Sequence, residues 1–149
     1  MKHIEKRVLN HTPQNLFNLV SDVNKYPEFL PWCLGARVKN FFKNKFDADL
    51  IIGFRIYKEV YSSQILLDPN NYKITVNYKD GPFEYLHNYW IFKENSDGCE
   101  VEFMVEFKFK SIFLQTVMES LFAEAVKKMV SAFESRANNL YNQTISNQL

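Results

Sequence analysis

The chain of 149 residues is poor in glycine and histidine, and each shortage excludes a kind of site. Its 4 glycines, at positions 35, 53, 81 and 98, lie too far apart for the glycine-rich turns that bring backbone amides to phosphate. Its 3 histidines show no HExxH or similar spacing of metal ligands. We therefore predict neither a nucleotide-binding loop nor a metal site.

Cysteines and long apolar runs are also scarce. Cys33 and Cys99 are isolated thiols without CxxC spacing, which argues against a disulfide framework and for a reducing compartment. No window approaches the roughly 18 apolar residues that identify a membrane-spanning helix, and the first nine residues lack a signal core. We expect a cytoplasmic protein; a peripheral contact with the inner face of the inner membrane is compatible with this pattern.

The chain also lacks an excess of one charge and lacks catalytic signatures. A formal net charge of +1 gives no overall field that would draw nucleic acid, so we expect no DNA partner. Glu59, Glu84 and Glu106 lie on or beside expected strands, but no acid and base pair can be identified among them. We therefore predict no catalytic residue and no enzyme, although a cyclase-like activity is the enzymatic alternative.

What the chain does contain is a long helical pattern near its end, over residues 111–141. Apolar residues recur there at steps of three and four, neither glycine nor proline interrupts them, and Ser111 is a suitable N-cap. In the first half the apolar positions cover more than a half circle, so this half needs apolar cover on more than one side. A strongly curved sheet would provide that cover, and so would a sheet that leaves an apolar cavity beside the helix. Plain core packing remains a third interpretation.

The residues before this helix predict a strand at 2–9, a helix that starts at Thr12-Pro13 and a second short helix at 22–26. From residue 37 the period is two, which predicts about six antiparallel strands joined by hairpins. One inward face carries Ala48, Leu50, Ile52, Phe54 and Ile56, and the next carries Tyr61, Ser63, Ile65 and Leu67. We predict a single α+β domain over residues 1–142, with a curved sheet around the last helix, and a polar tail at 143–149.

Two stretches present unusual side chains. The loop Tyr26-Pro27-Glu28-Phe29-Leu30-Pro31-Trp32-Cys33 must fold Phe29, Leu30 and Trp32 into the core or present them to a ligand or membrane. The basic residues Arg37, Lys39, Lys43 and Lys45 alternate with phenylalanines, which suits anionic lipid headgroups or RNA phosphate. A solvated hairpin edge protected by lysines explains the same pattern.

These motifs also carry a family resemblance. The run from Asp22-Val23 through the loop to Gly35-Ala36-Arg37-Val38 resembles the START-like family of coenzyme Q-binding proteins, within the polyketide cyclase/dehydrase-like superfamily, which also includes the ribosome-association toxin RatA. Further matches are Gly53-Phe54, Asp80-Gly81-Pro82-Phe83, Leu86 with Trp90 and Phe92, and Ala132-Phe133-Glu134-Ser135-Arg136-Ala137. The resemblance extends from about His3 to Tyr141 and implies a helix-grip fold.

The resemblance also implies a function. Such proteins would bind ubiquinone or a related isoprenoid lipid in an apolar cavity between sheet and helix, as noncatalytic carriers that support respiration and require no cofactor. The alternative is a RatA-like toxin that binds the ribosome and blocks subunit association, with Arg37, Lys39, Lys43 and Lys45 as contacts to ribosome or membrane. The expected cavity residues are Tyr26, Pro27, Phe29, Leu30, Trp32, Phe54, Phe83, Asn88, Trp90, Phe107, Met118, Phe122, Ala125 and Met129. Asn88 is either a donor to a quinone carbonyl or a buried amide satisfied by backbone.

Overall fold

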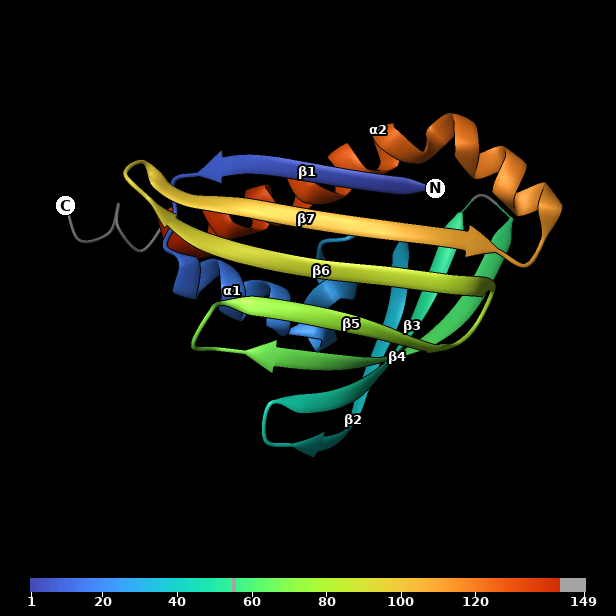
Figure 1. Cartoon of the computed structure of the whole chain (residues 1–149), viewed down its shortest axis with the longest axis horizontal. Helices are drawn as coiled ribbons and strands as arrows, with labels where there is room; N and C mark the ends of the chain where they lie inside the picture. Colours follow the sequence, from blue (N-terminus) through green and yellow to red (C-terminus); the bar gives the residue numbers. More distant parts are fainter. Residues whose placement is uncertain (55, 143–149) are drawn as a thin grey trace.

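The computed structural model describes residues 1–54 and 56–142. Seven strands within these residues form one antiparallel sheet, in the order β1-β7-β6-β5-β4-β3-β2 (Figure 1). The strands are β1 Lys2–Leu9, β2 Cys33–Phe42, β3 Lys45–Phe54, β4 Tyr57–Asp68, β5 Lys73–Asp80, β6 Phe83–Asn95 and β7 Gly98–Phe109. The helices are α1 Pro13–Ser21, the 3₁₀ helix η1 Val23–Glu28, α2 Ile112–Ala137 and the π-helical turn η2 Asn138–Asn142. The predicted polar tail at 143–149 lies outside the described residues.

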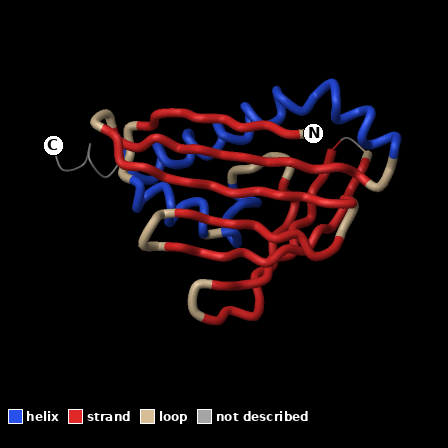
Figure 2. The backbone as a smooth tube through the Cα atoms, in the orientation of Figure 1, coloured by secondary structure: helices blue, strands red, loops and turns tan. Residues whose placement is uncertain are grey.

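The strand order follows from successive hairpins. Strands β2 to β7 each pair with their neighbour in the chain, and β1 pairs with β7 at the other edge. The helices cover one face of the curved sheet (Figure 2). The predicted α+β helix-grip fold is therefore confirmed, including the long C-terminal helix and the two short helices after the first strand.

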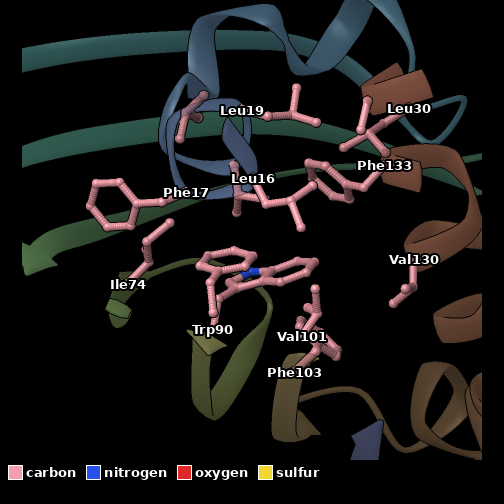
Figure 3. Close-up of a cluster of buried hydrophobic side chains, with 14 of the residues drawn as sticks. Leu16, Phe17, Leu19, Leu30, Ile74, Trp90, Val101, Phe103, Val130 and Phe133 are labelled. Atoms are coloured by element: carbon pink, nitrogen blue, oxygen red, sulfur yellow. The ribbon is translucent and has the colours of Figure 1, made fainter. Parts of the chain in front are cut away.

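The core lies between the sheet and the second half of α2. Trp90 of β6 is its centre, with ring centroids 4.6 Å from Phe103 and 5.1 Å from Phe133 of α2 (Figure 3). From α1, Leu16, Phe17, Leu19 and Val20 complete the cluster, and all four are buried. Contacts among large aromatic side chains thus fix the second half of α2 on the sheet.

Both predicted helix starts are confirmed by their capping hydrogen bonds. The Thr12 hydroxyl accepts from the Asn15 amide at 3.1 Å, and the Ser111 hydroxyl accepts from the Leu114 amide at 3.2 Å. Each bond satisfies an amide that has no partner inside its helix. The local sequence therefore sets where α1 and α2 begin.

Three predicted boundaries differ from the structure. Helix η1 passes through Pro27 to Glu28, because the Tyr26 carbonyl accepts from the amides of Phe29 and Leu30 and so continues the turn beyond the proline. Strand β3 ends at Phe54, where Phe54 pairs with Tyr57, so Ile56 is 90% exposed rather than on the inward face. Helix α2 ends at Ala137, and a wider π-helical turn carries the chain to Asn142.

The two halves of α2 differ in burial. In the second half Val126, Val130, Phe133 and Ala137 are buried against the sheet and α1. In the first half the apolar side chains of Leu114, Val117, Met118, Leu121 and Phe122 are only half-buried. This half extends past the end of the sheet near the β3–β4 turn (Figure 1). The wide apolar arc predicted for it is not filled by core packing.

Candidate functional site

Two adjoining apolar chambers lie between the concave face of the sheet and α2. The outer chamber has a volume of about 280 Å³ and the inner one about 120 Å³. They adjoin because both are lined by Trp32, Tyr61, Leu86, Phe103, Val105 and Met129. The sequence left three arrangements open for the first half of the helix: a strongly curved sheet, an apolar cavity beside the helix, or plain core packing. In the structure the sheet is curved and leaves an apolar cavity beside the helix.

The outer chamber lies under the first half of α2. Helix residues Leu114, Val117, Met118 and Phe122 form one wall, and Phe83, Phe107 and Phe109 of the sheet form the opposite wall. Ala125 lines the chamber and is itself exposed to solvent, so the chamber is open alongside the helix. Its only charged lining residue in the described part of the chain is Glu59. The surface is suited to hydrocarbon.

The inner chamber is enclosed by α1, η1, the sheet and the second half of α2. Its walls include Val20 of α1, Trp90 of β6 and Phe133 of α2. Among the described residues none of its lining side chains is charged. Its lining residues with polar side-chain groups are Tyr26, Tyr61, Ser63 and Asn88, together with the indole rings of Trp32 and Trp90.

Most of the predicted cavity residues line these chambers. They are Tyr26, Asn88 and Trp90 in the inner chamber, Phe83, Phe107, Met118, Phe122 and Ala125 in the outer one, and Trp32 and Met129 in both. The side chain of Phe54 lies outside the described part of the structure. Pro27, Phe29 and Leu30 line neither chamber, which corrects the prediction for them.

Phe29 and Leu30 lie outside the chambers because of the way their loop packs. Leu30 is fully buried in the core, and the Phe29 ring lies 5.1 Å from that of Phe133. The Arg136 guanidinium covers Phe29 at 5.3 Å and pairs with Glu28 at 3.1 Å. The loop is thereby attached to α2 behind the inner chamber, and only Tyr26 and Trp32 face the cavity.

The polar groups of Tyr26 and Asn88 already have partners. The Tyr26 hydroxyl donates to the Val20 carbonyl, and burial raises the pKa of this hydroxyl well above its usual range. The Asn88 amide donates to the Met104 carbonyl at 2.8 Å. Of the two interpretations of Asn88, this geometry favours an amide anchored by backbone.

Sequence reasoning did not single out Tyr61 and Ser63 as site residues. Ser63 is 2% exposed and lines the inner chamber, and Tyr61 lines both chambers. Neither hydroxyl has a hydrogen-bond partner among the described residues. The signal was present in the sequence, because these two residues interrupt an otherwise apolar inward face that continues through Ile65 and Leu67.

The predicted basic residues lie on the β2–β3 hairpin (Figure 1), and none of them lines either chamber. The Ser62 hydroxyl donates to Asp49, and together with Lys39, which pairs with the same carboxylate at 3.0 Å, it keeps the pKa of that carboxyl below its usual range. The Lys43 ammonium lies 5.5 Å from the Phe42 ring centroid. Phe41 and Phe42 at the hairpin tip are mostly exposed. The hairpin therefore combines cations with exposed aromatic rings.

Other candidate chemistry is weak within the described residues. No group of three His, Cys, Asp or Glu side chains is placed to hold a metal there. Cys33 and Cys99 are free and buried, and burial raises both thiol pKa values, that of Cys99 to about 11. A thiol with a raised pKa is a poor nucleophile at neutral pH. No helix in this part of the chain has the length and apolarity required to cross a bilayer.

Residues 9–134 match the family model described as polyketide cyclase/dehydrase and lipid transport. The chain belongs to this family. It is 36% identical to the ribosome association toxin RatA of Rickettsia prowazekii over 137 residues, which cover 90% of this chain and 94% of the relative. It is also 31% identical to the mitochondrial coenzyme Q-binding protein COQ10 homolog B of Xenopus laevis over 147 residues, covering 96% of this chain and 60% of the relative.

Solved structures agree with the fold. The 18 kDa protein CC1736 of Caulobacter crescentus matches with a TM-score of 0.80 and 35% identity, covering 95% of this chain and 99% of that chain. The Zhui aromatase/cyclase of Streptomyces matches with a TM-score of 0.80 but only 11% identity, covering 93% of this chain and 92% of that one. At such low identity the likeness shows the shared fold alone.

Proposed function

We propose that this protein binds ubiquinone or a related isoprenoid lipid in the two chambers and acts as a noncatalytic carrier. The observation that carries this proposal is the pair of adjoining apolar chambers between the sheet and α2. Apolar walls of this kind provide most of the affinity for a hydrocarbon tail, and a few polar groups orient the ligand. The similarity to a protein named as coenzyme Q-binding supports the same ligand class.

A lipid carrier must load and unload at a bilayer, so a peripheral membrane contact belongs to the proposal. Ile56, Ile112 and Phe113 are exposed apolar residues, and the Phe113 ring lies 5.8 Å from Tyr57, which lines the outer chamber. Exposed apolar clusters of this type often contact membranes or partners. In a vesicle flotation assay, replacing Ile112 and Phe113 by serine should reduce binding; unchanged flotation would remove this part of the proposal.

Native mass spectrometry with organic extraction tests the ligand itself. The protein is purified from a quinone-producing host without detergent, and any bound lipid is identified after extraction. We expect prenylquinone at close to one molecule per chain. An empty protein, or one that carries only lipids without a quinone head, would contradict the proposal.

A second candidate function is binding to the ribosome with inhibition of subunit association. It is favoured by the relatives named RatA and by the β2–β3 hairpin, where Arg37, Lys43 and Lys45 accompany the exposed rings of Phe41 and Phe42. Binding through phosphate contacts weakens steeply as salt concentration rises.

Sedimentation of ribosomal subunits with added protein tests this candidate. The wild type should reduce the fraction of assembled ribosomes at low salt, and exchanging Lys43 and Lys45 for glutamate should abolish the effect. The matched control exchanges Lys127 and Lys128, which are exposed residues of α2 rather than of the hairpin. Unchanged sedimentation profiles with the wild type at low salt would exclude this candidate.

A further inference from the structure

Two hydroxyl groups that line the inner chamber have no hydrogen-bond partner among the residues that the structure describes. Ser63 is almost fully buried, and its hydroxyl faces a chamber in which none of the described side chains bonds to it. Tyr61 lies two residues earlier on the same face of β4 and lines the same chamber. A buried hydroxyl without a hydrogen bond is costly, so such groups in a binding cavity indicate a polar ligand atom.

Asn88 adds an acceptor to the lining of this chamber. The Asn88 amide nitrogen donates to the Met104 carbonyl at 2.8 Å, which holds the side-chain oxygen in place. Burial raises the pKa of the Tyr61 hydroxyl far above its usual range, so it remains protonated and able to donate. The chamber thus offers two donors on β4 and one acceptor on β6.

The size and charge of the chamber restrict what can occupy it. A cavity of about 150 Å³ holds one benzene-sized ring. The inner chamber, with about 120 Å³, is smaller than this, so a ring that enters it must extend into the adjoining outer chamber. No described lining residue carries a charge that could pair with a phosphate or a carboxylate. Burying an anion there would cost far more than burying a neutral carbonyl. A phospholipid or fatty-acid head does not fit these conditions.

We propose that the inner chamber is the head-group subsite: the carbonyl-bearing edge of a neutral six-membered ring enters it first and accepts hydrogen bonds from Tyr61 and Ser63, while the rest of the ring extends into the outer chamber. The isoprenoid tail then lies in the outer chamber under the first half of α2 and leaves beside Ala125. This inference rests on the proposed lipid-binding function and adds the orientation of the ligand, the two donors, and selection against charged heads.

Three ligands with the same geranyl tail test the subsite by calorimetric titration. They are ubiquinone-2, the hydrocarbon 2,6-dimethylocta-2,6-diene without a head, and geranyl phosphate. We expect the wild type to bind the quinone most tightly and the phosphate most weakly. Tighter binding of the phosphate than of the quinone would overturn the proposed subsite.

Variants that each remove one oxygen then test the donors. Tyr61→Phe and Ser63→Ala should each weaken ubiquinone-2 about fivefold to tenfold, since a lost hydrogen bond in a buried site has about this effect. Affinity for the headless hydrocarbon should not fall. The matched controls Tyr85→Phe and Ser62→Ala, which change residues outside both chambers, should leave both affinities unchanged.

The outcomes separate this inference from the function on which it rests. Quinone affinity that persists in the double variant Tyr61→Phe/Ser63→Ala overturns the head-group subsite while leaving lipid binding intact. An equal loss for quinone and hydrocarbon also overturns it, because the hydroxyls would then act on the tail or on folding. Failure of the wild type to bind either the quinone or the hydrocarbon overturns both. Far-ultraviolet circular dichroism of each variant confirms that it is folded.

Discussion

The substitution Ala125→Phe examines the outer chamber directly. Ala125 lines this chamber and is exposed, so a larger side chain can enter the empty volume without displacing buried residues. A benzene-sized ring requires a cavity of about 150 Å³, which is roughly half of the 280 Å³ available. The new ring should therefore exclude about one five-carbon isoprene unit from the wall.

The loss of binding free energy follows from the number of ligand carbon atoms that are no longer buried. At about 0.8 kcal/mol for each buried methylene, one isoprene unit contributes at most about 4 kcal/mol. Part of this is recovered because a flexible tail can bend around the ring. We expect the Kd for a long-chain prenylquinone to rise about tenfold to a hundredfold, equivalent to about 1.4 to 2.8 kcal/mol. The free energy of unfolding should change by less than about 1 kcal/mol.

Intrinsic fluorescence provides the assay. The chain has 2 tryptophans, Trp32 and Trp90, and both line the chambers, so a bound quinone should quench them. The matched control is Ala123→Phe, which adds the same ring to an exposed position of α2 that lines neither chamber. An unchanged Kd for Ala125→Phe, or an equal rise for both variants, would refute the assignment of the tail to the outer chamber.

Two further predictions concern stability. Phe133→Ala should lower the free energy of unfolding by about 3 to 5 kcal/mol, because the Phe133 ring packs on Trp90, Tyr26 and Phe29. Phe113→Ala, on the exposed end of α2, should lower it by less than about 1 kcal/mol. Equal losses for the two variants in urea denaturation would contradict the division of α2 into a buried half and a half-buried half. Burial raises the pKa of the Cys99 thiol from 9.0 to about 11. Between pH 9 and 11 the unfolded chain loses this proton while the folded chain keeps it, so the contribution to stability is complete below pH 9 and falls as the pH rises. Urea midpoints at pH 8 and 10.5 should differ less in Cys99→Ala than in the wild type, and an equal difference would exclude Cys99 as a cause.

The features that could be predicted from the sequence are those that local chemistry decides. The hydroxyls of Thr12 and Ser111 fix the starts of α1 and α2 within one turn. Alternation with period two identifies the strands, because each inward face must be apolar. The wide apolar arc in the first half of α2 indicated that something other than a flat sheet lies beside it, and a chamber lies there.

The features that could not be predicted depend on residues far away in the chain. Phe29 and Leu30 belong to an apolar loop. Leu30 is buried in the core, and Phe29 packs against the core through Phe133 and Arg136, which lie more than one hundred positions later. The different surroundings of Asn88 and Ser63 also depend on residues far away in the chain. Both are polar residues on inward faces, but Asn88 is anchored because β7 brings the Met104 carbonyl beside it.

The energetic cost of the inner chamber leads to the last prediction. Apolar side chains that line an unfilled chamber lose packing contacts, which lowers stability, and the inner chamber leaves about 120 Å³ of such volume. Ala48 lies on the chamber wall in β3 and is fully buried. Ala48→Val adds two methyl groups of strand-compatible shape, which should fill part of the chamber.

We expect Ala48→Val to raise the free energy of unfolding of the ligand-free protein by about 1 kcal/mol and to weaken ubiquinone-2 binding at least tenfold. The two effects have opposite signs because the same volume is a defect for folding and a site for the ligand. Urea denaturation and calorimetric titration measure them on one preparation. A variant that is less stable and binds as tightly as the wild type would mean that the space beside Ala48 is already filled by core side chains, and the inner chamber could not receive a ring.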